Sequence, residues 1–313
     1  GNLTFDGSGG AWTFASSATT SDLTITTGTV TAPATSLAIE GEYTNNGTFN
    51  HNSGEVRSAG EAYDFGSFAF DRTVLYILED ASTQDQTSIL FNATGSILYI
   101  AGSDGPIEEY NLATPYDIST ASYGSVSLSA TGLDGNPSGL LFNNDGTVLY
   151  VLATNNDEVY EYTLSTAYDL STASYSSMVL SVTGEEGFPN DMFFNNDGTS
   201  LYVTGSIDDE INEYTLSTPY DISTASFDSI VLDVSGQTSG PEDVLFSQDG
   251  SQLYVAGGTG IYRYILSTPY DISTALFNET VIDVSGELSS VDQIFFNQTI
   301  IFYLPTRVFS PFS

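Results

Sequence analysis

The chain contains no cysteine and no lysine, and it has a single histidine, His51. Without cysteine there is no disulfide framework, no thiolate metal site and no cysteine nucleophile. The usual bases that activate a nucleophile are nearly absent, so carboxylates are the groups left for acid–base chemistry. Neither a Gly-x-Ser-x-Gly motif, nor a P-loop, nor a His-Glu-x-x-His motif is present. We therefore predict that the chain is not an enzyme and has no catalytic or cofactor-binding residues.

Positive charge is also scarce, because four arginines stand against 40 acidic residues and the net charge is −36 at pH 7. Such a surface repels phosphate backbones and anionic lipid headgroups, so we expect no nucleic-acid partner. It suits divalent cations, high salt or a cationic partner. Charged residues are nevertheless only 14% of the chain, while 20 tyrosines and 19 phenylalanines indicate an aromatic core rather than disorder.

Long apolar runs are missing as well. None approaches the ~18 residues that a membrane-spanning helix needs, so we expect no membrane insertion in this chain. No signal peptide is visible, and the sequence begins with Gly1 rather than Met. This start favours a processed or truncated product of a longer precursor.

What the sequence does contain is a repeated phrase. LSTPYDISTA occurs at residues 216–225 and 266–275, with near copies at 164–173 and 112–121, so the starts lie 50 to 52 residues apart. Turn glycines and strand tyrosines keep the same interval: Gly95, Gly146, Gly198, Gly250, Tyr99, Tyr150, Tyr202 and Tyr254. Each interval holds four short strand-like segments, which is the period of a β-propeller blade.

The phrase itself falls between the third and fourth strands of each unit. We interpret it as a capped loop in which proline sets a turn and the aspartate accepts a backbone N–H two residues on. The alternative is a ring of recognition loops around the rim.

We predict an all-β fold, with a β-propeller of five to six four-stranded blades over residues 60–313 and a small β-rich segment over residues 1–59. The complete repeats cover 89–137, 138–188, 189–240 and 241–289, and the partial blades cover 60–88 and 290–313. Both partial blades resemble first and second strands, so how the ring closes stays open between divergent strands, unusual pairing and strands from a neighbouring molecule. The first 59 residues lack the repeat interval and could form a cap, a sheet packed on the propeller, or an arm.

Two segments resemble known families. FNNDGTVLYV (142–151), followed by the strand EVYEY (158–162), resembles YVTN-type repeats of surface-layer propellers. EYTNNGTFNHNSG (42–54) is similar to segments of large secreted surface proteins that form β-solenoid rungs. These resemblances imply a location outside the cell or on its surface, and they carry no chemistry because propellers host many functions.

Acidic residues gather at the turn into the third strand of successive repeats. Oxygen-rich turns of this kind suit Ca²⁺, although a solvated acidic loop is the simpler interpretation. The candidate calcium ligands are Asp157, Glu158, Asp208, Asp209 and Glu210.

Three functions remain. The first is an extracellular structural or adhesive protein, a self-assembling subunit of a fibre, sheath or surface layer whose terminal segments hold the homopolymer together. The alternative is a monomeric propeller that binds a glycan or another surface protein. A carboxylate-dependent hydrolase or lactonase ranks last, because the sequence shows no convergent base, nucleophile and oxyanion donor.

Overall fold

The computed structural model describes residues 2–21, 23–32, 36–39, 43–45, 48–50, 55–58, 84–103, 105–129, 136–283, 291, 293–297 and 300–304. The chain divides into two compact units, Gly1–Arg72 and Thr73–Ser313. Strands make up both units, and the described helices are single 3-10 turns. Within these ranges no helix has the length and apolar character that crossing a membrane requires.

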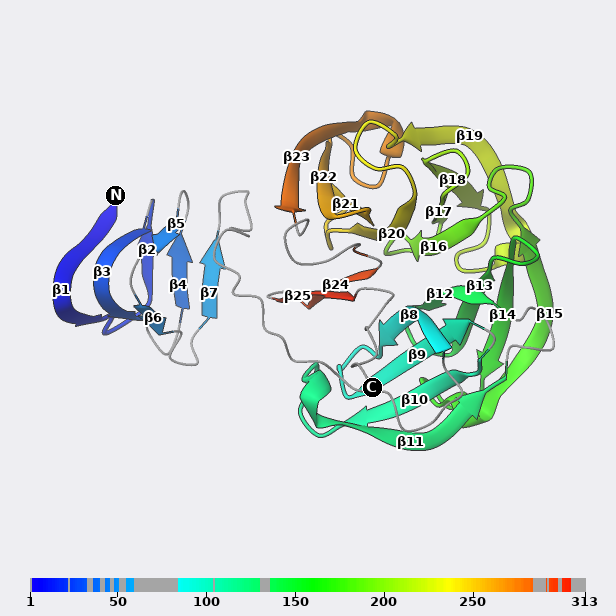
Figure 1. The fold of residues 1–313 in the computed structure, drawn as a ribbon, viewed down its shortest axis with the longest axis horizontal. Helices are drawn as coiled ribbons and strands as arrows, with labels where there is room; N and C mark the ends of the chain where they lie inside the picture. The colour runs from blue at the N-terminus through cyan, green and yellow to red at the C-terminus, as the bar shows by residue number, and fades with distance from the viewer. Residues whose placement is uncertain are drawn as a thin grey trace, which may run out of the picture. The chain divides into compact units, whose positions relative to one another are not determined.

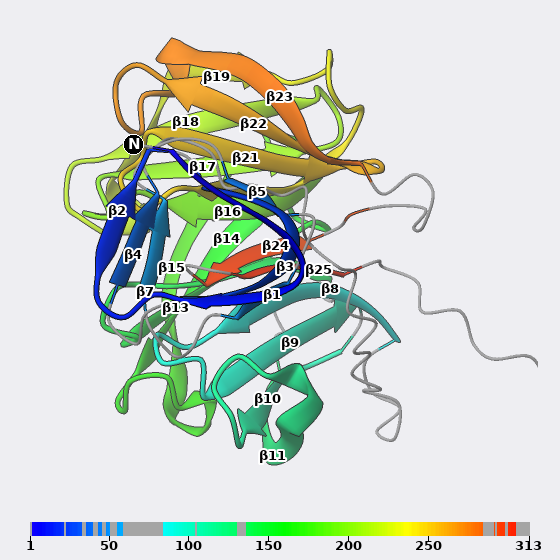
Figure 2. The ribbon, with the colours of Figure 1, turned by 90° about the vertical axis from the view of Figure 1, so that its left-hand side faces the viewer.

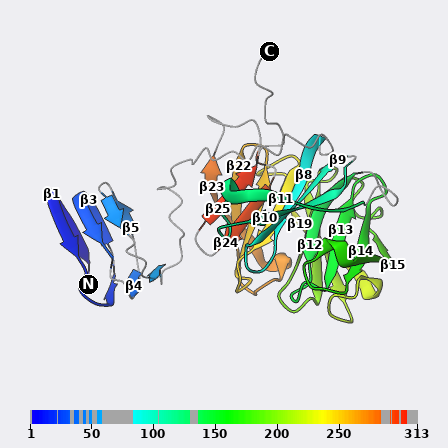
Figure 3. The same cartoon turned by 90° about the horizontal axis from the view of Figure 1, so that it is seen from below.

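The first unit is a coil of parallel strands. One sheet contains β1 (Leu3–Thr13), β3 (Leu23–Thr31), β5 (Tyr43–Asn45) and β6 (Thr48–Asn50), and the other contains β2 (Ala18–Thr20), β4 (Ser36–Ile39) and β7 (Glu55–Ser58). Figure 3 shows β1, β3 and β5 side by side.

The register of this coil gives its repeat. Leu3 stands opposite Leu23, and Leu23 opposite Tyr43, so each rung adds 20 residues on this sheet. Leu23, Ile25 and Leu37 are fully buried between the two sheets. Stacked parallel rungs around a narrow apolar interior are the architecture of a β-solenoid.

The second unit is a β-propeller made of four-stranded antiparallel blades (Figure 1). The first blade is β8 (Gln84–Phe91), β9 (Ile97–Ser103), β10 (Ile107–Leu112) and β11 (Ala121–Leu128). The second is β12 (Pro137–Phe142), β13 (Val148–Ala153), β14 (Glu158–Leu164) and β15 (Ala173–Ser181). The third is β16 (Pro189–Phe194), β17 (Ser200–Gly205), β18 (Glu210–Leu216) and β19 (Ala225–Asp233). The fourth is β20 (Pro241–Phe246), β21 (Gln252–Gly257), β22 (Gly260–Leu266) and β23 (Ala275–Asp283).

The blade count corrects the sequence prediction. The described residues contain four four-stranded blades, so five to six such blades is wrong for this part of the chain. A two-stranded sheet, β24 (Gln293–Asn297) with β25 (Ile300–Leu304), lies between β20 and β8 (Figures 1 and 2). The remainder of the predicted partial blade 290–313, and nearly all of 60–88, lies outside the described residues.

Side chains of the innermost strands connect one blade to the next. Asp191 Oδ2 accepts a hydrogen bond from Val244 N at 3.2 Å, and Asp243 Oδ2 accepts one from Ile294 N at 2.6 Å. Gln293 Oε1 accepts from Ile89 N and so joins β24 to β8. The exposed edges of the inner strands would otherwise leave these N–H groups unpaired. The ring therefore closes through side chains as well as through apolar packing.

The repeated loop is a structural element in every blade. Its aspartate accepts hydrogen bonds from the backbone N–H and hydroxyl of the serine two residues on, as between Asp221 and Ser223 at 3.1 and 2.5 Å, which confirms the predicted cap. The tyrosine before it, Tyr220, has a positive φ of 62° and covers Gly198 with its ring. Equivalent pairs are Tyr116 with Gly95, Tyr168 with Gly146, and Tyr270 with Gly250.

Candidate functional site

The acidic residues predicted as calcium ligands lie in the hairpins between the second and third strands of two blades. Asp157 and Glu158 belong to the second blade, and Asp208, Asp209 and Glu210 belong to the third. The segments that enter the innermost strands lie at the same end of each blade, because the strands are antiparallel. We call residues 183–188, 205–210 and 235–240 the third-blade loop face.

The backbone conformation gives two of these residues a structural task. Asp157 and Asp209 have positive φ values of 53° and 57°, a region that aspartate tolerates better than most residues. The Asp209 side chain also accepts a hydrogen bond from Gly240 N at 2.7 Å, which ties two loops of the face together. In the second blade, Glu158 accepts a hydrogen bond from the Tyr160 hydroxyl at 2.6 Å.

The structure therefore does not bring the five predicted residues together as one ligand set. Within the described ranges, no group of three or more His, Asp or Glu side chains could hold a metal ion. Asp208 does lie close enough to Glu210 to raise the pKa of that carboxyl, although burial is the larger cause. Calcium binding at these residues stays a prediction.

A carboxylate that the sequence did not single out lies at the centre of the third-blade loop face. Glu186 is only 1% exposed, and its Oε1 accepts hydrogen bonds from Phe188 N at 2.9 Å and Ile207 N at 3.3 Å. Its Oε2 is buried without a hydrogen-bond partner. Burial, and then the charge of Asp208, raise the pKa of Glu186 above its ordinary value. A group of this kind can donate or accept a proton.

The surroundings of Glu186 combine tight packing with exposed apolar side chains. A Cβ atom on Gly205 would lie 2.4 Å from the Glu186 Cδ, so only glycine leaves room for this carboxyl. Phe188 and Ile207, whose N–H groups hold Glu186, are 48% and 61% exposed. Its sequence neighbour Glu185 instead accepts a hydrogen bond from the Tyr214 hydroxyl at 3.1 Å. The two glutamates are indistinguishable in the sequence because the difference between them is burial.

A second buried carboxyl pair lies on the innermost strands. Asp191 and Asp243 are both buried, and their side chains hydrogen-bond to one another. Burial raises the pKa of both groups, and for Asp243 the neighbouring charge of Asp191 raises it further. Two carboxyls in contact inside a protein share a proton rather than both ionise. Sequence reasoning missed this pair because the corresponding residues of the other inner strands are Ser88, Gly139 and Gln293.

Comparisons with known proteins agree on the fold. No family model and no curated protein matches the chain. A putative 6-phosphogluconolactonase from Bacteroides uniformis is 13% identical, with a TM-score of 0.45 over 67% of this chain and 59% of its own. A protein from Lactobacillus plantarum is 16% identical, with a TM-score of 0.47 over 70% of this chain and 64% of its own. The periplasmic gluconolactonase of Pseudomonas aeruginosa is 15% identical, with a TM-score of 0.41 over 71% and 57%.

These similarities show an all-β propeller fold, and this chain spans less than two thirds of the length of each of those chains. They also correct one expectation. The prediction that the chain is not an enzyme is contradicted, because propellers similar to this one include proteins named as lactonases.

Proposed function

We propose that this chain is an extracellular structural protein, a subunit of a fibre, sheath or surface layer that assembles with copies of itself. The observation that carries the proposal is the parallel β-solenoid of the first unit. Solenoids are one-dimensional stacks in which each rung contacts its neighbours, and they suit extended assemblies. The repeated loops of the propeller support the same function, since their aspartate and tyrosine side chains are consumed in internal bonds.

The proposal is tested by electron microscopy of the full-length protein and of two variants on one solenoid strand. Ile25→Asp places a charge in the fully buried interior, whereas Thr26→Asp places the same charge on the exposed face of β3. Filaments or sheets are expected for the wild type and Thr26→Asp. They should be lost in Ile25→Asp, because an unpaired charge cannot be buried there.

Near-ultraviolet circular dichroism should show that the aromatic core of the propeller stays folded in Ile25→Asp. Dispersed single particles in the wild type, or assembly that survives Ile25→Asp, would overturn the proposal. A monomeric propeller that binds a glycan or another surface protein would then be the function to test.

Carboxylate-dependent hydrolysis, as of a lactone, is the second candidate, and Glu186 is the observation that favours it. Its pKa is raised, one of its oxygens has no hydrogen-bond partner, and Asp208 lies near it. In such a pair the protonated carboxyl acts as the general acid and the ionised one as the general base.

We expect Glu186→Gln to lower any lactone or aryl-glycoside turnover by about 100-fold, the usual contribution of a positioned acid or base. Glu185→Gln, one residue away, should leave the rate unchanged. Initial rates on a panel of lactones and aryl glycosides measure this. Absence of turnover in the wild type, or equal loss in both variants, rules out this assignment.

A further inference from the structure

One position in the third strand of each blade carries a charged side chain next to the following blade. It lies directly opposite the repeated tyrosine of the second strand. The pairs are Glu109 with Tyr99, Glu161 with Tyr150, Glu213 with Tyr202, and Arg263 with Tyr254. Three blades thus place an acid where the fourth places a base.

Each of the three glutamates faces the loop aspartate of the next blade. The charge of that aspartate contributes to the raised pKa of the glutamate, with burial as the larger cause. The tyrosine opposite the glutamate reaches the same loop, as the Tyr202 hydroxyl donates to the main-chain oxygen of Tyr270. We call these sites the inter-blade slots: Glu109 with Asp169, Glu161 with Asp221, and Glu213 with Asp271.

The slots carry negative charge that the protein does not neutralise. Glu109 and Glu213 are 8% and 7% exposed, and each has an Oε2 atom that is buried without a hydrogen-bond partner. Burying an ionised carboxyl costs several kcal/mol unless a cation or proton compensates it. The loop aspartates are half-buried, so solvent reaches the outer side of each slot. The whole sequence has only four basic residues besides its one histidine.

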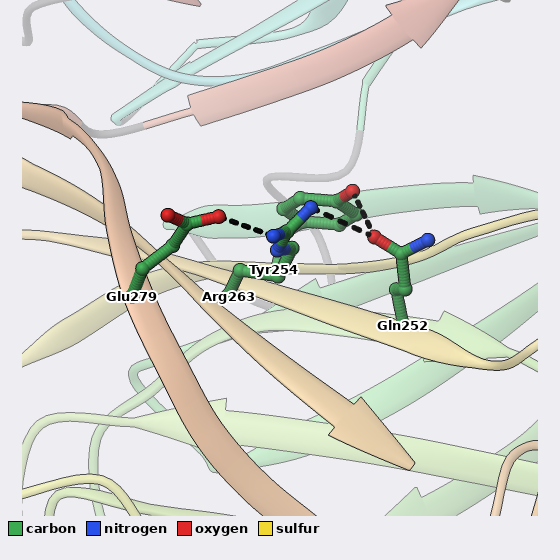
Figure 4. A network of polar contacts seen from close by, with 4 residues as sticks. All are labelled: Gln252, Tyr254, Arg263 and Glu279. Carbon is green, nitrogen blue, oxygen red and sulfur yellow. Dashed lines mark hydrogen bonds and ion pairs between the residues drawn. The ribbon is translucent and has the colours of Figure 1, made fainter. Parts of the chain in front are cut away.

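The fourth blade shows what this position can hold. Arg263 is 6% exposed, and its guanidinium forms an ion pair with Glu279. It also donates to Gln252 Oε1 at 3.4 Å, and the same oxygen accepts a hydrogen bond from the Tyr254 hydroxyl at 2.8 Å (Figure 4). A positive charge surrounded by side-chain oxygens is therefore compatible with the blade geometry at this point.

We propose that the three inter-blade slots bind small hard cations, Ca²⁺ or Na⁺, held between the glutamate of one blade and the loop aspartate of the next. These ions prefer carboxylate, hydroxyl and water oxygens with loose geometry. The slots supply the two carboxylates, and the third slot adds the Ser200 hydroxyl that donates to Glu213 at 3.2 Å. One divalent ion balances the two negative charges of a slot, as Arg263 balances Glu279.

The test uses the full-length protein, stripped with a chelator and kept at pH 8.5 so that the proton is a weak competitor. CaCl₂ or NaCl is titrated against choline chloride at constant ionic strength, because choline screens charge but is too large for a slot. Melting temperature and calorimetric stoichiometry are measured. The variants are Glu213→Gln, the triple change of Glu109, Glu161 and Glu213 to Gln, and Asp6→Asn, which removes one exposed charge from the first unit.

We expect saturating ion to raise the melting temperature of the wild type by at least about 5 °C, a size that ion binding to the folded state alone can supply. Glu213→Gln should lose one bound ion and about a third of this rise. The triple variant should lose all of it, and Asp6→Asn should lose none. A response to Ca²⁺ alone assigns a divalent ion, and an equal response to NaCl assigns a monovalent ion.

Two results would overturn the proposal. One is an ion response in the triple variant equal to that of the wild type. The other is a wild type that responds to pH but to neither ion, since the proton alone would then occupy the slots. Glutamine is close in shape to glutamate, so these variants are expected to fold, and Glu213→Gln alone keeps the test decisive if the triple variant does not.

Discussion

Replacing Gly198 with alanine is expected to lower the free energy of unfolding by about 3 kcal/mol or more, from left-handed strain together with overpacking. Gly198 has a φ of +72°, and a Cβ atom there would lie 2.4 Å from the Tyr220 ring. That ring has little room to move. It packs against Phe194 with centroids 5.3 Å apart, and its hydroxyl donates to Asn196 O at 3.0 Å.

Gly184→Ala is the matched control, because Gly184 lies in an exposed turn and a Cβ atom there meets nothing within 4 Å. Urea unfolding of both variants and the wild type gives the comparison. Equal midpoints for the two variants would contradict the account of the loop given above. A loss confined to Gly198→Ala would mean that glycine and tyrosine recur together because each blade needs the pair.

The recurring residues explain why the blades could be predicted. Gly146 and Gly198, or Tyr150 and Tyr202, do the same task in successive blades, so the sequence repeats wherever the local structure repeats. The predicted hairpin turns and loop caps rest on contacts within a few residues, such as Asp221 with Ser223. Short-range interactions of this kind can be read directly from a sequence.

The blade count and the solenoid register could not be read in the same way. Inner-strand pairs such as Asp243 with Ile294 are 51 residues apart and join different side chains in each blade. In the first unit, partners are 20 residues apart on one sheet, as Leu3 and Leu23, but 19 apart on the other, as Leu37 and Val56. A weak period with short strands gives little sequence signal.

The candidate site shows a different limit. Asp208 and Asp209 attracted the calcium hypothesis because acidic residues are adjacent in the sequence. In the structure, Asp209 forms the turn, while Glu186 from another loop is the buried carboxyl. Adjacency in sequence does not reveal burial, and burial is what gives a carboxyl unusual chemistry.

Asp243→Asn is expected to remove a pH-dependent loss of stability from the ring. In the wild type the folded-state pKa of Asp191 is about 6, and that of Asp243 lies well above its usual 3.8. The folded state therefore binds more protons than the unfolded state above about pH 4, and stability falls as pH rises through these values. In the variant, an amide donates to Asp191 permanently and its oxygen still accepts from Ile294 N.

The difference between the two proteins isolates this pair from the other carboxyls. We expect Asp243→Asn to equal the wild type within about 0.5 kcal/mol at pH 4, and to be more stable by about 2 kcal/mol at pH 8, as a pKa shift of this direction and size requires. Urea unfolding at one-unit pH steps measures both. Asp145→Asn is the contrasting control, because hydrogen bonds from Thr147 lower the pKa of that exposed carboxyl and its effect has the opposite sign.

A difference curve for Asp243→Asn that stays flat between pH 4 and pH 8 would mean that the two carboxyls do not share a proton in the folded ring. A difference curve that rises with pH has a structural consequence beyond the pair. Asp243 holds Ile294 at the start of β24, the strand that joins the fourth blade to the first. Ionising the pair then weakens the ring at the one inner strand whose sheet has only two described strands.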